Sequence, residues 1–262
     1  TEEAAPILNG DAPVNKLKVV SSQNSLNNNG LVSTDDLQAG TRRKLHGLLP
    51  QMLVSGAAFL LAAGAGMPIG YSAVLLPQLQ VANSTLPTDN ELGSWIASVH
   101  SAATPVGSFV SGLMMDKWGR RRVLQICVLP LTLGWVMIAV AKSHGVILAG
   151  RVMAGLAVGL SAAPGQVFLG EVAEPKMRGL LSSIPYVSYS LGILLVYILG
   201  ATLHWQTVAW LATILPIMSL LSFILLPESP VWLVRNDRVE EASKALNWLR
   251  GGKTGGKQCC SH

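Results

Sequence analysis

The sequence predicts an all-α protein that crosses a membrane six times, with both termini in the cytoplasm. Half of the 262 residues are hydrophobic and only 13% are charged, whereas a soluble domain carries about 25% charged residues. The apolar residues gather into runs near or above the roughly 20 residues that span a bilayer. A soluble helical core does not explain runs of this length. The predicted spans are residues 48–79, 92–115, 123–141, 146–170, 180–202 and 207–226.

Basic residues flank these runs unevenly, and this asymmetry predicts the orientation. Lys and Arg are dense before the first run and after the second, fourth and sixth, whereas the alternate loops hold only Lys142. Loops rich in Lys and Arg stay on the cytoplasmic side of a membrane. The same pattern accounts for the net charge of +5, so the charge gives no support to nucleic-acid binding.

Residues 47–226 form the predicted six-helix transmembrane domain. The segments outside it are predicted to lie in water. Residues 1–46 form a polar tail that we expect to be disordered in the cytoplasm. Asn83 begins an Asn-Ser-Thr sequon in the first outer loop and is a candidate glycosylation site. Residues 227–250 are predicted to form a Pro-Glu-Ser-Pro turn and an amphipathic cytoplasmic helix. Residues 251–262 are expected to be unstructured.

Charged residues at the predicted inner face are candidates for a gate. Charge pairs there would hold while the pathway is open to the outside and separate when it opens inward. Glu171 could pair with Arg178 in its own loop, or with Arg120 or Arg121 across the face. The alternatives are a basic turn that only sets topology and loop charges that are simply solvated. The candidate inner-gate residues are Asp116, Gly119, Arg120, Arg121, Glu171, Arg178 and Glu228.

Polar and aromatic residues inside the spans are candidates for a substrate site. Small-molecule sites combine apolar and aromatic walls with a few polar groups. Tyr186 and Tyr189 are three residues apart and therefore share a helix face. For each candidate, a hydrogen bond between helices is the alternative role. The candidate substrate-binding residues are Tyr71, Ser72, Gln166, Tyr186, Tyr189 and Ser190.

Taken together, these motifs resemble the sugar porter family of the major facilitator superfamily. The resemblance covers residues 50–251, and the segment 245–251 is similar to the facilitated trehalose transporter branch. It implies the N-terminal half of a twelve-helix carrier, built as two inverted three-helix repeats. It also implies alternating access to a sugar, trehalose or a hexose, in the plasma membrane. The matching motifs are Asp116-x-x-Gly-Arg-Arg, Gly150-Arg-x-x-x-Gly, Glu171 with Arg178-Gly, and Pro-Glu228-Ser-Pro-x-Trp-Leu.

Two departures from the family bear on substrate and coupling. Hexose transporters place a sugar-binding Gln eight residues after the loop Arg, where this chain has Tyr186. The identity of the sugar therefore stays open. Sugar–proton symporters of the family carry an Asp after the Gly-Tyr of the first span, where this chain has Ser72. No Asp or Glu lies inside any predicted span, although a proton relay would need one. We therefore predict facilitated diffusion.

The chain carries about half of the helices that the family has, which leaves three interpretations. It is a truncated form or fragment of a full carrier, or it pairs with a second half-transporter, or it is a non-transporting protein that regulates or sequesters a full-length homologue. The expected partners are a sugar and the lipid bilayer. No metal spacing, nucleophile constellation or phosphate loop occurs in the sequence, so we predict no enzyme activity, cofactor or metal.

Overall fold

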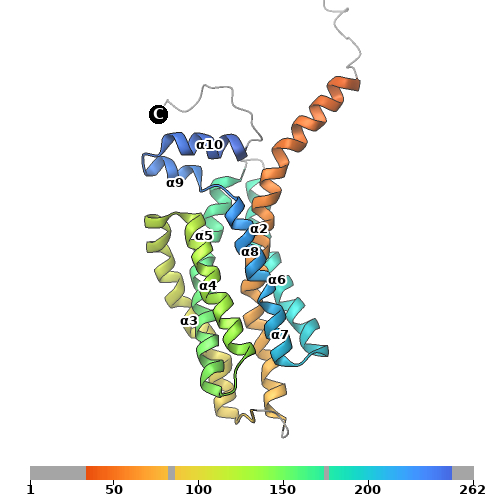
Figure 1. Ribbon diagram of the computed structural model, residues 1–262, viewed down its shortest axis with the longest axis vertical. Helices are drawn as coiled ribbons and strands as arrows, with labels where there is room; N and C mark the ends of the chain where they lie inside the picture. Colours follow the sequence, from red (N-terminus) through yellow and green to blue (C-terminus); the bar gives the residue numbers. More distant parts are fainter. Residues whose placement is uncertain (1–33, 82–85, 174–176, 250–262) are drawn as a thin grey trace, which may run out of the picture. The chain divides into compact units, whose positions relative to one another are not determined.

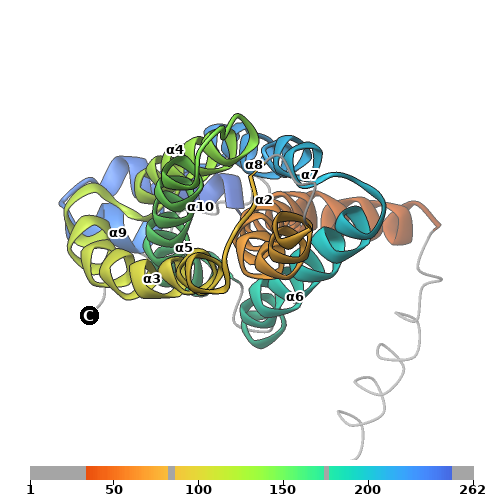
Figure 2. The same ribbon diagram turned by 90° about the horizontal axis from the view of Figure 1, so that it is seen from below.

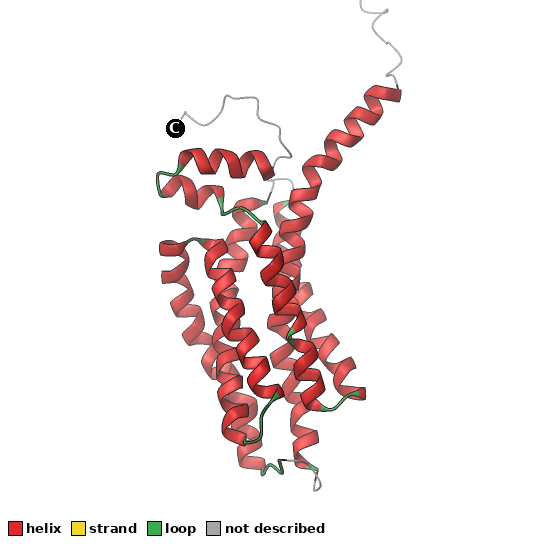
Figure 3. Cartoon of the chain, in the orientation of Figure 1, coloured by secondary structure: helices red, strands yellow, loops and turns green. Residues whose placement is uncertain are grey.

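The computed structural model describes residues 34–81, 86–173 and 177–249. The chain forms two units, Thr1–Lys44 and Leu45–His262, and the fold described below is that of the second. Over the described residues every regular element is a helix and no strand occurs (Figure 3). The candidate glycosylation site Asn83 and most of both predicted tails fall outside the described residues.

The helices follow one another through short connections (Figure 1). Their bounds are α2 (Thr34–Gln80), α3 (Asn90–Trp118), α4 (Arg120–Ala139), α5 (His144–Val172), α6 (Arg178–Thr202), α7 (Trp205–Ala212), α8 (Ile214–Leu225), α9 (Pro230–Arg235) and α10 (Val239–Leu249).

Five helical segments within the described residues are long and apolar enough to cross a membrane. Helix α3 is 29 residues long but is not one of the five, since polar residues such as Ser94, Ser98 and His100 interrupt its apolar sequence. The predicted span 92–115 lies within this helix and stays a prediction. The five segments are Pro50–Gln80, Arg120–Ala139, His144–Val172, Arg178–Thr202 and Trp205–Leu225.

The last of these segments is interrupted, which the hydropathy pattern does not reveal. Helix α7 ends at Ala212, and α8 begins two residues later, at Ile214. Proline lacks a backbone N–H, and its ring crowds the carbonyl four residues earlier. For Pro216 that carbonyl belongs to Ala212. The backbone N–H of Thr213 bonds the Trp210 carbonyl, three residues earlier, at 3.2 Å, and not the carbonyl four residues earlier as in a regular α-helix. The helix is therefore broken at this residue.

Small residues let pairs of helices pack closely. A Cβ atom added to Gly192 on α6 would meet the carbonyl of Ala63 on α2, and one added to Gly155 on α5 would meet the carbonyl of His100 on α3. Such close backbone approach is typical of helix pairs in membranes. Seen from below, α2 lies beside α6, and α3 lies beside α5 (Figure 2).

The apolar core has two main parts. One centres on Tyr71, Trp135 and Trp205, which are fully buried; the rings of Tyr71 and Trp135 meet edge to face with centroids 5.1 Å apart. The other includes Phe168 and Phe223, near the ends of α5 and α8. Helices α9 and α10 pack on each other through a separate cluster, Trp232, Leu233, Ala242 and Ala245.

Candidate substrate cavity and inner-face charge network

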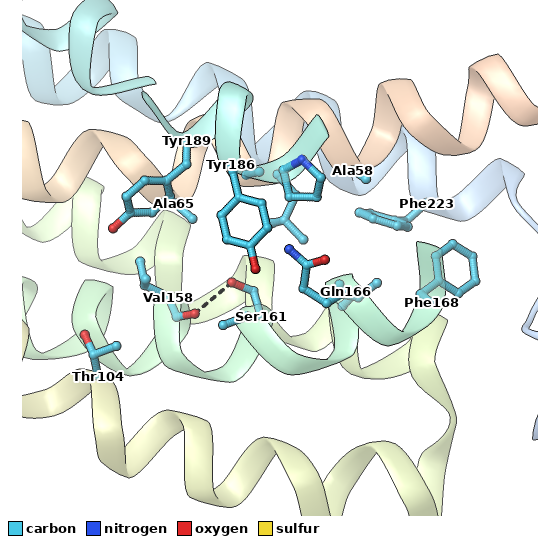
Figure 4. A pocket seen from close by; sticks show the side chains of 16 residues that line it. Ala58, Ala65, Thr104, Val158, Ser161, Gln166, Phe168, Tyr186, Tyr189 and Phe223 are labelled. Carbon is cyan, nitrogen blue, oxygen red and sulfur yellow. Dashed lines mark hydrogen bonds between the residues drawn. The ribbon is translucent and has the colours of Figure 1, made fainter. Parts of the chain in front are cut away.

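A cavity of about 370 Å³ lies within the bundle. Its volume is within the ~300–1,000 Å³ typical of small-molecule sites. Most of its wall is apolar, from residues such as Leu61, Val158 and Phe168. The polar side chains that line it are Thr104 from α3, Ser161 and Gln166 from α5, and Tyr186 and Tyr189 from α6 (Figure 4). Aromatic faces with a few polar groups are the composition expected of a site for a small polar ligand.

Three of the six predicted substrate-binding residues meet at this cavity: Gln166, Tyr186 and Tyr189. They come from α5 and α6 and face the same space (Figure 4). The Gln166 amide makes no hydrogen bond with any described residue, so its donors and acceptor are free for a ligand. Tyr186 is 69% exposed, and the cavity is therefore open on the α6 side.

The other three predicted residues lie elsewhere. The Tyr71 hydroxyl is buried and donates to the Trp205 carbonyl at 2.8 Å. The Ser72 hydroxyl contacts the Arg151 guanidinium, and the Ser190 hydroxyl donates to the carbonyl of Tyr186 at 3.2 Å. None of the three lines the cavity. Tyr71 and Ser72 bond other helices, which is the alternative role that the sequence left open, whereas Ser190 bonds the backbone of its own helix.

Arg151 is a buried cation that the sequence pattern did not mark as a site residue. Only 1% of it is exposed. Its guanidinium donates to the carbonyls of Pro68 on α2 and Ile96 on α3, the latter at 3.2 Å, and it contacts Ser72. The signal was present, because an arginine inside an apolar span is costly and is normally held by internal partners. Here it bonds α5 to both α2 and α3.

The charge network lies where the ends of α3, α5 and α8 meet the starts of α4 and α9 (Figure 1). Arg120 is 3% exposed, and its guanidinium is 3.1 Å from a Glu171 carboxylate oxygen and 3.8 Å from Asp116. The second Glu171 oxygen accepts from the hydroxyl of Ser229, which is also buried. A buried ion pair needs such extra bonds to offset the loss of hydration.

Arg121 and Glu228 bind each other through the backbone rather than through an ion pair. The Arg121 N–H donates to the Glu228 carboxylate at 2.8 Å. The Arg121 guanidinium instead donates to the carbonyls of Phe223 and Ile224, at 2.9 and 2.8 Å. These carbonyls belong to the last turn of α8 and have no partner within that helix. Arg121 therefore caps α8 and fixes it to the start of α4.

Gly119 connects α3 and α4 in one residue, with φ of +93°. Residues other than glycine rarely adopt this backbone conformation. A Cβ atom there would also lie 2.7 Å from the Glu228 carboxylate. Glycine is needed at this position both for the turn and for the carboxylate beside it.

Arg178 is separate from this network. It begins α6, is exposed, and forms no ion pair with a described residue. Of the pairings that the sequence left open, the structure forms Glu171 with Arg120. It also adds two partners without charge that no charge pattern reveals: Ser229, and Trp232, whose indole N–H donates to the Asp116 carbonyl at 3.0 Å. The described residues hold no cluster of His, Cys, Asp and Glu suited to a metal.

Comparison with known proteins gives consistent relatives. Residues 58–259 match the family described as sugar (and other) transporter. The facilitated trehalose transporter Tret1 of Bombyx mori is 34% identical over 80% of this chain and 41% of its own length. The Tret1 protein of Apis mellifera ligustica is 33% identical over 74% of this chain and 40% of its own length. The chain therefore spans less than half the length of these curated relatives.

Solved structures show the same fold. The xylose transporter XylE from E. coli, in a partially occluded inward-open conformation, aligns with a TM-score of 0.69 at 19% identity, over 77% of this chain and 56% of that one. A second XylE structure, described as a proton:xylose symporter of the major facilitator superfamily, aligns with a TM-score of 0.66, also at 19% identity, over 77% of this chain and 50% of that one.

Proposed function

Because the chain belongs to the sugar (and other) transporter family, we propose that its helical bundle is one half of a carrier that moves trehalose or a hexose by facilitated diffusion. The chain has the major facilitator fold, and its relatives are transporters rather than enzymes. Trehalose is the first substrate to test, since several relatives are named for it. We place the carrier in the plasma membrane.

The observation that carries this proposal is the cavity at Gln166, Tyr186 and Tyr189. A sugar offers hydroxyl groups and apolar C–H faces. The free amide of Gln166 suits the hydroxyls, and the rings of Tyr186 and Tyr189 suit the faces. The cavity is open on the α6 side, where Tyr186 is exposed. We propose that a second six-helix bundle supplies the remaining wall of the sugar site.

For the topology, we propose that α3 is the sixth span and that both termini are cytoplasmic. The 29 residues of α3 are long enough to cross a bilayer. Its polar side chains need not face lipid, since His100 and Ser111 are buried against other helices. The basic loop at Lys117 and Arg120–Arg122 then lies on the cytoplasmic side, as the excess of basic residues favours.

For the mechanism, we propose alternating access with the inner-face network as the gate. The bonds of Arg120 to Glu171, and of Glu171 to Ser229, join the loop before α4, the end of α5 and the turn before α9. A rocking motion of repeats or halves around a central site would break such bonds at one face. Uncoupled transport fits Arg151, whose partners are carbonyls and Ser72 rather than a carboxylate that binds protons.

The test is uptake of labelled trehalose and glucose into vesicles. One set holds this whole chain alone, and a second holds it joined to the C-terminal half of the Bombyx mori relative. We expect saturable uptake only in the second set, unaffected by a protonophore. Gln166→Ala should reduce it, whereas Gln206→Ala, on α7 and outside the cavity, serves as the control, since its side chain forms no hydrogen bond with a described residue. A fused protein that reaches the membrane intact but takes up neither sugar contradicts the proposal, as does uptake by the unfused chain.

A further inference from the structure

A second cavity, of about 480 Å³, lies between the start of α4, the end of α8 and helices α9 and α10. We call it the α8–α10 cavity. Four basic residues line it: Arg121, Arg122, Arg238 and Lys244. It shares Arg121, Glu228 and Trp232 with the inner-face network proposed as the gate, but its other basic residues have no part in that network.

Two of these four cations are already bonded, and two are free. Arg121 donates to the α8 carbonyls, and Arg238 pairs with Glu241 at 2.6 Å. Arg122 and Lys244 are exposed and form no hydrogen bond or ion pair with any described residue. They come from α4 and α10, so two unpartnered cations from different helices line one cavity.

The two carboxylates that line the cavity are also occupied. Glu228 accepts from the N–H groups of Arg121 and Ser229, at 2.8 and 3.0 Å. Glu241 accepts from Arg238. Neither acid is therefore bonded to Arg122 or Lys244. The lining carries four basic and two acidic residues, and the net positive charge belongs to the free cations. Such a cavity suits an anion with several acceptor oxygens, above all a phosphate ester.

The apolar residues around the cavity indicate where the anion comes from. Leu225, which lines the cavity at the end of the apolar segment Trp205–Leu225, is 75% exposed, and its neighbour Ile224 is also exposed. Trp248 on α10 also lines the cavity and is 37% exposed. Tryptophan is enriched where a membrane meets water. The cavity therefore joins a hydrocarbon-facing helix end to a basic surface.

We propose that the α8–α10 cavity binds the headgroup of an anionic phospholipid, with Arg122 and Lys244 on its phosphate and the acyl chains along Ile224 and Leu225. Given the topology proposed above, this lipid belongs to the cytoplasmic leaflet, where anionic lipids and basic pockets meet. A lipid bound there would contact α4, α8 and α10 together, beside the gate but outside the sugar cavity.

The experiment measures lipid retention by native mass spectrometry of the whole chain from nanodiscs. The discs contain phosphatidylcholine alone, or phosphatidylcholine doped with phosphatidylinositol phosphate in both leaflets, so orientation does not affect the result. We expect selective retention of the anionic lipid. The double variant Arg122→Gln/Lys244→Gln should weaken it by about tenfold, because each basic residue near a membrane surface adds to lipid attraction.

The matched control is Lys117→Gln/Arg235→Gln, which removes the same charge from exposed residues that do not line the cavity. It should leave retention within about twofold. Both double variants should keep the unfolding temperature, since none of the four side chains has a bonded partner among the described residues. Equal loss in both variants would show diffuse attraction and overturn the proposal. No preference for the doped discs would also overturn it. If soluble inositol phosphate competes as strongly as the lipid does, the ligand of the cavity is a soluble phosphate ester, and the lipid proposal is overturned.

Discussion

At the scale of single residues, Arg151 has the densest set of partners inside the bundle. Its guanidinium bonds the carbonyls of Pro68 and Ile96 and contacts Ser72. Pro68 lies inside α2 and Ile96 inside α3, so the guanidinium bonds the backbone of two neighbouring helices. The arginine therefore ties both helices to α5.

Replacing Arg151 with Met should be strongly destabilising. The variant keeps the apolar stem but loses the bonds of the guanidinium to two buried carbonyls and to Ser72, which costs about 3 kcal/mol in the free energy of unfolding. The measurement is reversible unfolding in mixed micelles. The control is Arg178→Met, an exposed residue with no ion pair among the described residues, whose effect should stay within about 0.5 kcal/mol. Equal effects of the two substitutions would show that Arg151 does not hold the helices.

Gly119→Ala should also destabilise, for a different reason. The backbone there has φ of +93°, and forcing a residue other than glycine into such a region costs about 1–3 kcal/mol. The added Cβ would meet the Glu228 carboxylate as well. Gly112→Ala is the control: it lies within α3, a Cβ there meets nothing within 4 Å, and alanine favours helix. Measured in the same micelles, the free energy of unfolding should therefore fall for Gly119→Ala and rise for Gly112→Ala. A Gly119→Ala protein as stable as the parent would contradict the turn argument.

At the scale of helices, hydropathy located the elements but not their ends. Five of the predicted spans correspond to helices that are apolar enough to cross a membrane. Apolar content alone does not show the interruption at Thr213, which comes from the backbone effect of Pro216. Loop charges marked Arg120 and Glu171, but their pairing depends on which helix ends meet, and sequence spacing does not fix that. Ser229 and Trp232 joined the network without any charge to reveal them.

The proposed gate can be tested at this scale, because the bonds of the inner-face network join different helices and loops. In the fused carrier, Glu171→Gln should favour the inward-open form, since the amide keeps the shape but loses the ion pair with Arg120. The measurement places a cysteine at Gln166, after Ser replaces Cys259 and Cys260, and follows its labelling from the cytoplasmic side of vesicles. We expect labelling to rise about fivefold, equivalent to ~1 kcal/mol.

The control for the gate is Glu241→Gln. Its carboxylate also pairs with an arginine, Arg238, but that pair is exposed and lies three residues apart at the start of α10. An exposed pair contributes little, and this one joins no separate elements of the gate. Labelling that rises equally in both variants, or in neither, would argue against the inner-face network as the gate.

At the scale of the whole molecule, the fold was predictable because its signals are redundant: apolar runs, loop charge and motif spacing all indicate the same helical membrane fold. The candidate substrate cavity was predictable only in part. Gln166, Tyr186 and Tyr189 line it, whereas Tyr71, Ser72 and Ser190 bond backbone or Arg151 elsewhere. Span position gives depth and helix face, but whether a hydroxyl meets a neighbouring carbonyl or a cavity depends on how the helices pack.

The proposed lack of coupling gives the last prediction, which only the complete carrier can report. In the fused carrier, Ser72→Asp would place a carboxylate beside the Arg151 guanidinium, which the Ser72 hydroxyl already contacts. A carboxylate inside the membrane is neutral when protonated and is held by the arginine when ionised, so its proton can enter on one side and leave on the other. We expect sugar uptake by this variant to depend on a proton gradient and to fall when a protonophore is added, whereas the parent is unaffected. Ser190→Asp, exposed on α6 and away from Arg151, should remain insensitive. If the parent itself loses uptake with the protonophore, Arg151 and Ser72 are not the reason for uncoupled transport, and another proton-binding group must be present.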